Sequence, residues 1–150
     1  MKRDRINFGL MISLLLFCQI AFAQNEIFSK SEQAIQGYDP VAYFKESKPV
    51  KGNRAYVYRW KDVQWFFVNE ENLNDFKANP EKFAPQYGGF CAYGMAGGYK
   101  APTSADAWSI VDGKLYLNYD TKVQSLWKKD QAGFIKKANH NWPTVKKSKE

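Results

Sequence analysis

The stretch from Gln86 to Tyr99 constrains the fold most, because five of its 14 residues are glycine and three are tyrosine. Glycine readily adopts positive φ and lets other groups approach the main chain closely. A segment of this kind either wraps a ligand or packs tightly under a sheet. It also contains Cys91, the one cysteine outside the first 23 residues. This glycine-rich loop is therefore the first candidate for a functional site.

The first 23 residues have the pattern of a secretory signal peptide. Lys2, Arg3 and Arg5 precede an apolar run, Phe8 to Ile20, that is too short to span a bilayer comfortably. Ala21-Phe22-Ala23 is a small-residue cleavage motif. We expect an exported protein, periplasmic or secreted, with no transmembrane segment after cleavage. An uncleaved anchor is the less favoured alternative.

Removal of the signal peptide would leave Cys91 without an intramolecular partner. Cys18 lies within the signal, and the large Phe17 before it disfavours a lipoprotein cleavage site. In an oxidising compartment a lone thiol needs an explanation. Cys91 is buried, or pairs with another chain, or binds a ligand.

The length that remains after cleavage, 127 residues, is that of one ordinary domain. Without the three basic residues and one acid of the signal, the 22 basic and 15 acidic residues of the chain become 19 and 14, a net charge of +5. Lysines crowd the C-terminal part, but export and the absence of a recognition motif argue against nucleic acid as a partner. We expect a flexible leader at 24–33, a domain at 34–143 and a disordered basic tail at 144–150.

Two β-hairpins are predicted between short helices. Aromatic and β-branched residues flank Lys61-Asp62, and strand-like runs flank Asp112-Gly113, the dipeptide typical of a type I′ turn. Helices are expected to begin after Asp39, Asn69 and Asn79, which are good N-caps. Two more are expected around 123–127 and 134–138, and Trp142-Pro143 should close the domain. The pattern predicts an α+β fold with an antiparallel sheet of about four strands.

The order of these motifs resembles the YHS domain family. The resemblance rests on Gly37-Tyr38-Asp39-Pro40-Val41, on residues 67–72 and on Phe76 to Phe83. Residues 85–92, 108–118 and 141–143 are similar to the exported bacterial branch of that family. The similarity covers roughly residues 34–143 and implies a fold related to treble-clef zinc modules.

The cysteines that bind metal in other YHS proteins correspond to Ala42, Val68 and Asn72, which supply no thiolate. The resemblance therefore does not carry the metal site over to this chain. It implies the fold, and no common activity is implied for the exported branch.

A new metal site is one hypothesis for the glycine-rich loop. Cys91, Met95 and the single histidine, His140, are ligand types that suit copper or another soft metal ion. Alternatively Tyr87, Tyr93 and Tyr99, with Cys91, would bind a small ligand or haem in an apolar pocket that Trp65 and Trp108 help to line. In both cases the chain is an exported YHS-type binding domain.

Two other classes of function remain open. In a non-catalytic scaffold, Cys91 only packs, and aromatic and basic surfaces contact a protein partner. In a cysteine-dependent enzyme, Cys91 would need a base that no local motif supplies. Burial of Cys91 separates these hypotheses, because a ligand or a substrate has to reach the thiol. The cofactor and the oligomeric state are not specified by the sequence.

Overall fold

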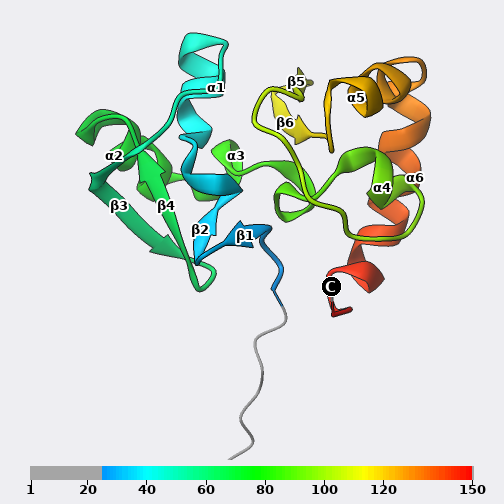
Figure 1. The fold of residues 1–150 in the computed structure, drawn as a ribbon, viewed down its shortest axis with the longest axis horizontal. Helices are drawn as coiled ribbons and strands as arrows, with labels where there is room; N and C mark the ends of the chain where they lie inside the picture. Colours follow the sequence, from blue (N-terminus) through cyan, green and yellow to red (C-terminus); the bar gives the residue numbers. More distant parts are fainter. Residues whose placement is uncertain (1–24, 150) are drawn as a thin grey trace, which may run out of the picture.

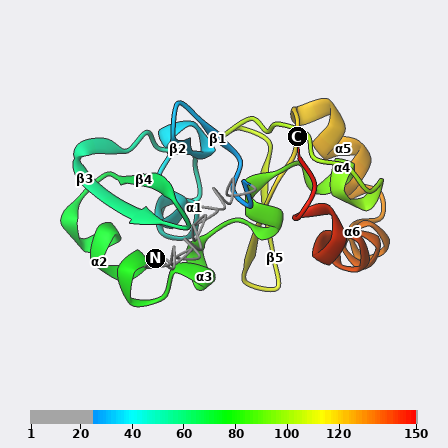
Figure 2. The ribbon, with the colours of Figure 1, turned by 90° about the horizontal axis from the view of Figure 1, so that it is seen from below.

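The computed structural model describes residues 25–149, which fold into two lobes that lie side by side (Figure 1). The predicted signal peptide lies outside the described residues. The first lobe contains strands β1 to β4 and helices α1 to α3, and the second contains helices α4 to α6. A hairpin, β5–β6, lies between them, as the view from below makes clear (Figure 2). None of the helices in residues 25–149 has both the length and the apolar character needed to span a membrane.

The α+β class is confirmed, but the single antiparallel sheet is wrong. The first lobe has a mixed sheet of four strands in the order β1-β2-β4-β3, in which β2 and β4 run parallel. Its strands are β1 (Ser29–Lys30), β2 (Gln33–Ala34), β3 (Asn53–Trp60) and β4 (Val63–Phe67). The second hairpin, β5 (Trp108–Val111) and β6 (Lys114–Leu117), forms a separate two-stranded sheet. Both predicted hairpins exist, but they do not pair with each other.

The turns of both hairpins have the positive φ values that their sequences favour. Lys61 and Asp62 have φ of 49° and 63°, and Asp112 and Gly113 have φ of 50° and 71°. Two successive residues with positive φ define the type I′ turn, whose twist matches that of the strands.

The predicted helix caps are present. Asp39 caps α1 (Pro40–Glu46), Asn69 caps α2 (Glu70–Ala78) and Asn79 caps α3 (Pro80–Phe83), each through its side-chain oxygen. The three helices of the second lobe are α4 (Ala92–Ala96), α5 (Thr121–Lys128) and α6 (Gln131–Val145). Helix α6 continues past Pro143, so the start of the predicted tail at 144–150 is helical.

The segment expected to be a flexible leader, 24–33, is integrated into the fold from Ile27 onward. Ile27 is 3% exposed, and the main chain of Phe28 donates a hydrogen bond to the carbonyl of Gly88 at 2.8 Å. Strand β1 and the start of β2 follow. Polar composition suggested a loose segment, but two adjacent apolar residues anchor it, since Ile27 packs in the core of the first lobe and Phe28 against that of the second.

A lysine holds the beginning and the end of the described chain together. The ammonium of Lys100 donates hydrogen bonds to the carbonyl oxygens of Asn25 at 3.0 Å and Ser148 at 2.7 Å, and it approaches that of Lys146 at 3.4 Å. It also lies 5.1 Å from the centroid of the Phe90 ring. Main-chain oxygens at the end of α6 carry partial negative charge, so a cation is favoured there.

Strand β6 belongs to two hydrophobic cores at once. Leu115 and Leu117 lie in the core of the first lobe with Trp65, Phe67 and other side chains. Tyr116, between them, lies in the core of the second lobe. Successive side chains of a strand point to opposite faces, so β6 forms a shared wall between the two cores.

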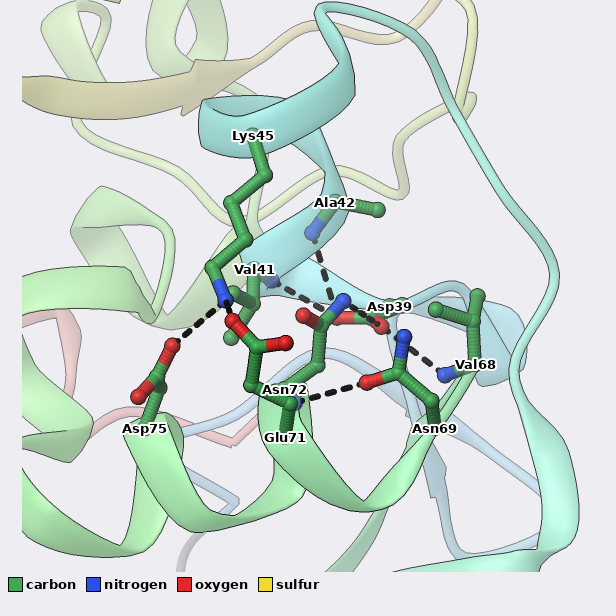
Figure 3. A network of polar contacts seen from close by, with 9 residues as sticks. All are labelled: Asp39, Val41, Ala42, Lys45, Val68, Asn69, Glu71, Asn72 and Asp75. Carbon is green, nitrogen blue, oxygen red and sulfur yellow. Dashed lines mark hydrogen bonds and ion pairs between the residues drawn. The ribbon is translucent and has the colours of Figure 1, made fainter.

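A buried carboxylate joins three elements of the first lobe (Figure 3). One oxygen of Asp39 accepts hydrogen bonds from the main-chain N–H groups of Val41 at 2.8 Å and Ala42 at 3.2 Å. The other accepts from the N–H of Val68 at 2.9 Å and from the side-chain amide of Asn72 at 2.8 Å. Asp39 is fully buried, so its charge is stabilised by these four donors in place of water.

We expect Asp39→Asn to lower the free energy of unfolding by about 2–3 kcal/mol. The amide keeps the shape of the side chain but turns an N–H group toward the donors of Val68 and Asn72. Urea denaturation of the variant, beside Asp106→Asn as an exposed control, measures the difference. The double variant D39N/N72D exchanges donor and acceptor between the two side chains and should recover part of the loss. Equal stability of Asp39→Asn and the control would contradict the role given to Asp39.

Candidate functional site

The glycine-rich loop is compact. It forms a 3₁₀ turn, η2 (Gln86–Gly89), and then helix α4. Tyr87, Gly88 and Gly89 have φ of 57°, 64° and 84°. A β-carbon on Gly88 would lie 1.7 Å from the carbonyl oxygen of Glu26, so only glycine fits where the N-terminal segment crosses the loop.

Cys91 caps helix α4 and is buried, with 1% of its surface exposed. Its sulfur accepts weak hydrogen bonds from the N–H groups of Tyr119 at 3.3 Å and Gly94 at 3.5 Å. The thiol lies 3.6 Å from the side-chain oxygen of Asn118, which also accepts from the N–H of Tyr93 at 3.0 Å. The thiol therefore connects the start of α4 to the end of β6.

Burial raises the pKa of the Cys91 thiol above its ordinary value, and the hydrogen bonds from the main chain only partly oppose this shift. A protonated, covered thiol is a poor nucleophile and a poor metal ligand, since both tasks need the thiolate. The environment of Cys91 thus suits a structural cap better than a reactive centre.

The three residues of the metal hypothesis have different surroundings. Met95 is fully buried in the core of the second lobe, whereas His140 is exposed on α6. The next residue, Asn141, is the one that contacts α4, through hydrogen bonds from its amide to the carbonyl oxygens of Met95 and Ala96. Across residues 25–149, no group of three or more His, Cys, Asp and Glu side chains is placed to hold a metal ion.

The three tyrosines of the loop make separate contacts. Tyr93 packs against Phe134 of α6 with ring centroids 5.0 Å apart. Tyr99 is 54% exposed, and its ring covers the backbone of α4 so closely that a β-carbon on Gly97 would lie 2.8 Å from it. Tyr87 is 4% exposed and donates a hydrogen bond to Asn139 at 2.9 Å. Burial raises the pKa of its phenol, so Tyr87 stays neutral.

Tyr87 lines a cavity of about 300 Å³ between the lobes, which we call the inter-lobe cleft. Its walls come from the N-terminal segment, the β3–β4 turn, the α3–η2 segment and α6. The charged and aromatic side chains of the cleft are Glu26, Trp60, Lys61, Glu81, Tyr87 and Trp142.

Two tryptophans face this cleft from opposite lobes. Trp60 ends β3 and packs against Trp65 and Phe76, with ring centroids 5.7 Å from each. Trp142 belongs to α6 and packs edge-on against Tyr87 at 6.2 Å. Both indoles are half-buried, so each has a fixed orientation and an accessible part.

Sequence reasoning selected Tyr87 but missed Trp60 and Trp142. It named Trp65 and Trp108 as aromatic candidates instead. Trp65 is fully buried in the first core, and Trp108 lines a different cavity, of about 470 Å³, beside β5 and α5. No local signal marks Trp60 or Trp142, because their proximity depends on how the two lobes pack.

Comparison of the chain with models of known protein families, with curated proteins and with solved structures finds no match in any of the three.

We expect Cys91 to resist a thiol reagent such as dithionitrobenzoate while the protein is folded. Burial and the contacts with Gly94, Asn118 and Tyr119 exclude the reagent, so modification should follow the unfolding curve in urea. Complete modification within seconds in native buffer would contradict the structural role. A Cys91→Ser variant provides the blank for the assay and retains a side chain that can cap α4.

The raised pKa of Cys91 also predicts a stability profile. Below pH 9.0, its ordinary pKa, the thiol is protonated in both the folded and the unfolded chain. Above that pH the unfolded chain ionises first, so the free energy of unfolding falls by up to about 1.4 kcal/mol per pH unit until the folded pKa is reached. Thermal or urea unfolding between pH 7 and pH 10 should show this fall, and Cys91→Ser should lack it. If the free energy of unfolding had the same pH dependence in both proteins, the predicted contribution of Cys91 would be refuted.

Proposed function

We propose that this chain is an exported, non-catalytic binding domain of the YHS type, and that it takes a small organic ligand in the inter-lobe cleft. The observation that carries the proposal is the meeting of Trp60, Tyr87 and Trp142 from separate elements around one cavity. Small-molecule sites are typically concave, lined by aromatic side chains, and supplied with a few polar groups. The YHS assignment and export rest on the sequence motifs described above.

The cleft is accessible to a ligand, whereas Cys91 is not. Cys91 is covered and hydrogen-bonded, whereas the cleft is partly open to solvent and is lined by Tyr87 and Gly88 of the glycine-rich loop. The glycine-rich loop thus contributes to binding through the residues that precede Cys91. The same burial of Cys91 weighs against a copper site or a cysteine nucleophile.

A protein-binding scaffold is the second candidate. Tyr99 and Tyr119 each expose more than half of their surface, at 54% and 53%. Tyr99 covers α4, and the main chain of Tyr119 binds Cys91 at the start of the same helix. Exposed tyrosines are enriched at protein interfaces, because the ring is apolar and the hydroxyl is polar.

The proposal is tested with ¹⁵N-labelled protein and four probes: methyl β-glucoside, choline, benzoate and indole. These represent a neutral polyol, an organic cation, an organic anion and an uncharged aromatic compound. We expect at least one probe to shift the indole N–H signals of Trp60 and Trp142 together, while those of Trp108 and Trp127 stay in place. Absence of any such shift at millimolar concentrations would overturn ligand binding in the cleft.

Removal of one indole provides the matching genetic test. We expect Trp142→Ala to weaken binding of the active probe at least about 10-fold, because a stacked aromatic surface is lost. Trp108→Ala is the control, since Trp108 lines another cavity. An equal effect of both substitutions on affinity would contradict the placement of the site.

A further inference from the structure

We propose that the ligand of the inter-lobe cleft is a neutral carbohydrate, bound by one pyranose ring stacked between or upon the two indoles. This inference rests on the proposed function and specifies its ligand class.

The aromatic surfaces are suited to the apolar face of a sugar ring. The C–H groups of a pyranose carry slight positive charge, and the face of an indole carries slight negative charge. Trp60 is held by Trp65 and Phe76, and Trp142 by Tyr87, so little side-chain freedom is lost when a ligand binds. A cavity of about 300 Å³ is at the small end of ligand sites, which suits one ring better than a long aromatic molecule.

The polar groups of the cleft include both donors and acceptors. Glu26 and Glu81 accept hydrogen bonds, Lys61 donates them, and the amide of Gln86 does both. A sugar hydroxyl also donates and accepts hydrogen bonds, so a polyol pairs with both the donors and the acceptors of this lining. A cation would pair only with the acceptors, and an anion only with the donors. The ammonium of Lys61 lies over the Trp60 ring, 4.9 Å from its centroid, so its N–H groups are close to any ligand that contacts this indole.

The charges of the cleft are nearly balanced. Glu26 lies 3.6 Å from the ammonium of Lys61 and 3.8 Å from that of Lys146. The lining itself, with Glu26, Glu81 and Lys61, has a formal charge of −1, and Lys146, which lies outside the lining but contacts Glu26, offsets this charge. A strongly charged ligand gains little from such a site, whereas a neutral one avoids the desolvation of an uncompensated ion.

The experiment extends the indole N–H titration to methyl β-glucoside, methyl N-acetyl-β-glucosaminide and the β-linked tetrasaccharides of each sugar. We expect at least one saccharide to shift the signals of Trp60 and Trp142. For a single ring, the ligand efficiency typical of small molecules gives a Kd of about 1 mM. Trp142→Ala should weaken saccharide binding, read at the Trp60 signal, at least about 10-fold, and Trp142→Phe should keep part of the affinity.

Glu81→Gln separates a neutral ligand from a cationic one. The amide retains a hydrogen-bonding oxygen, so saccharide affinity should change less than about 3-fold, whereas choline would lose its counter-charge. Glu70→Gln is the matched control, because both glutamates are exposed in the first turn of a helix and only Glu81 lines the cleft.

The outcomes separate the two proposals. Binding of choline, benzoate or indole in the cleft without any saccharide response would overturn the carbohydrate inference and leave the binding function standing. Saccharide shifts that persist in Trp142→Ala, or that appear only at Trp108, would also overturn the inference. No response to any probe at the two cleft tryptophans would overturn both proposals.

Discussion

The two faces of β6 impose the constraint on which the rest of the structure depends. Leu115 and Leu117 complete one core and Tyr116 completes the other, so neither lobe has a closed interior without this short strand. A shift of one residue in the β5–β6 register would exchange the two sets of side chains. The Asp112-Gly113 turn, with its two positive φ values, fixes that register. The hairpin therefore determines how the lobes face each other, and with it the distance between Trp60 and Trp142.

Two buried side chains, Asp39 and Cys91, connect several elements by hydrogen bonds, one on each side of β6. Asp39 joins the start of α1 to Val68 after β4 and to Asn72 on α2, all within the first lobe. Cys91 does the same in the second lobe, where its sulfur and Asn118 join the start of α4 to the end of β6. Both residues are helix caps with additional long-range contacts. Their burial follows from this task, since a cap shared by several elements lies where those elements meet.

Local chemistry made part of the fold predictable. Asp39, Asn69 and Asn79 cap helices because short side-chain acceptors meet free N–H groups there, and Asp112-Gly113 forms a turn because both residues tolerate positive φ. The mixed sheet was not predictable, because β1 and β2 have two residues each and the parallel pairing of β2 with β4 rests on one register pair, Gln33 with Gln64. The cleft was missed for a similar reason. Glu26, Trp60 and Trp142 are far apart in sequence, and only the packing of the lobes brings them to one cavity.

The contacts of Lys100 connect the wall of the cleft to the C-terminal end of the described chain. Glu26 forms part of that wall, and the preceding residue, Asn25, is tied by its carbonyl to the same ammonium that holds Ser148 beyond α6. If the cleft binds a ligand as proposed, the position of the N-terminal segment and the occupancy of the cleft are thermodynamically linked. Such linkage is reciprocal: a contact that holds residues 25–27 in place increases the affinity of the cleft for its ligand, and a bound ligand stabilises the position of those residues by the same free energy. A force on this segment would therefore change the affinity of the cleft for its ligand. A bound ligand would in turn make the N-terminal side more resistant to pulling and to proteolysis.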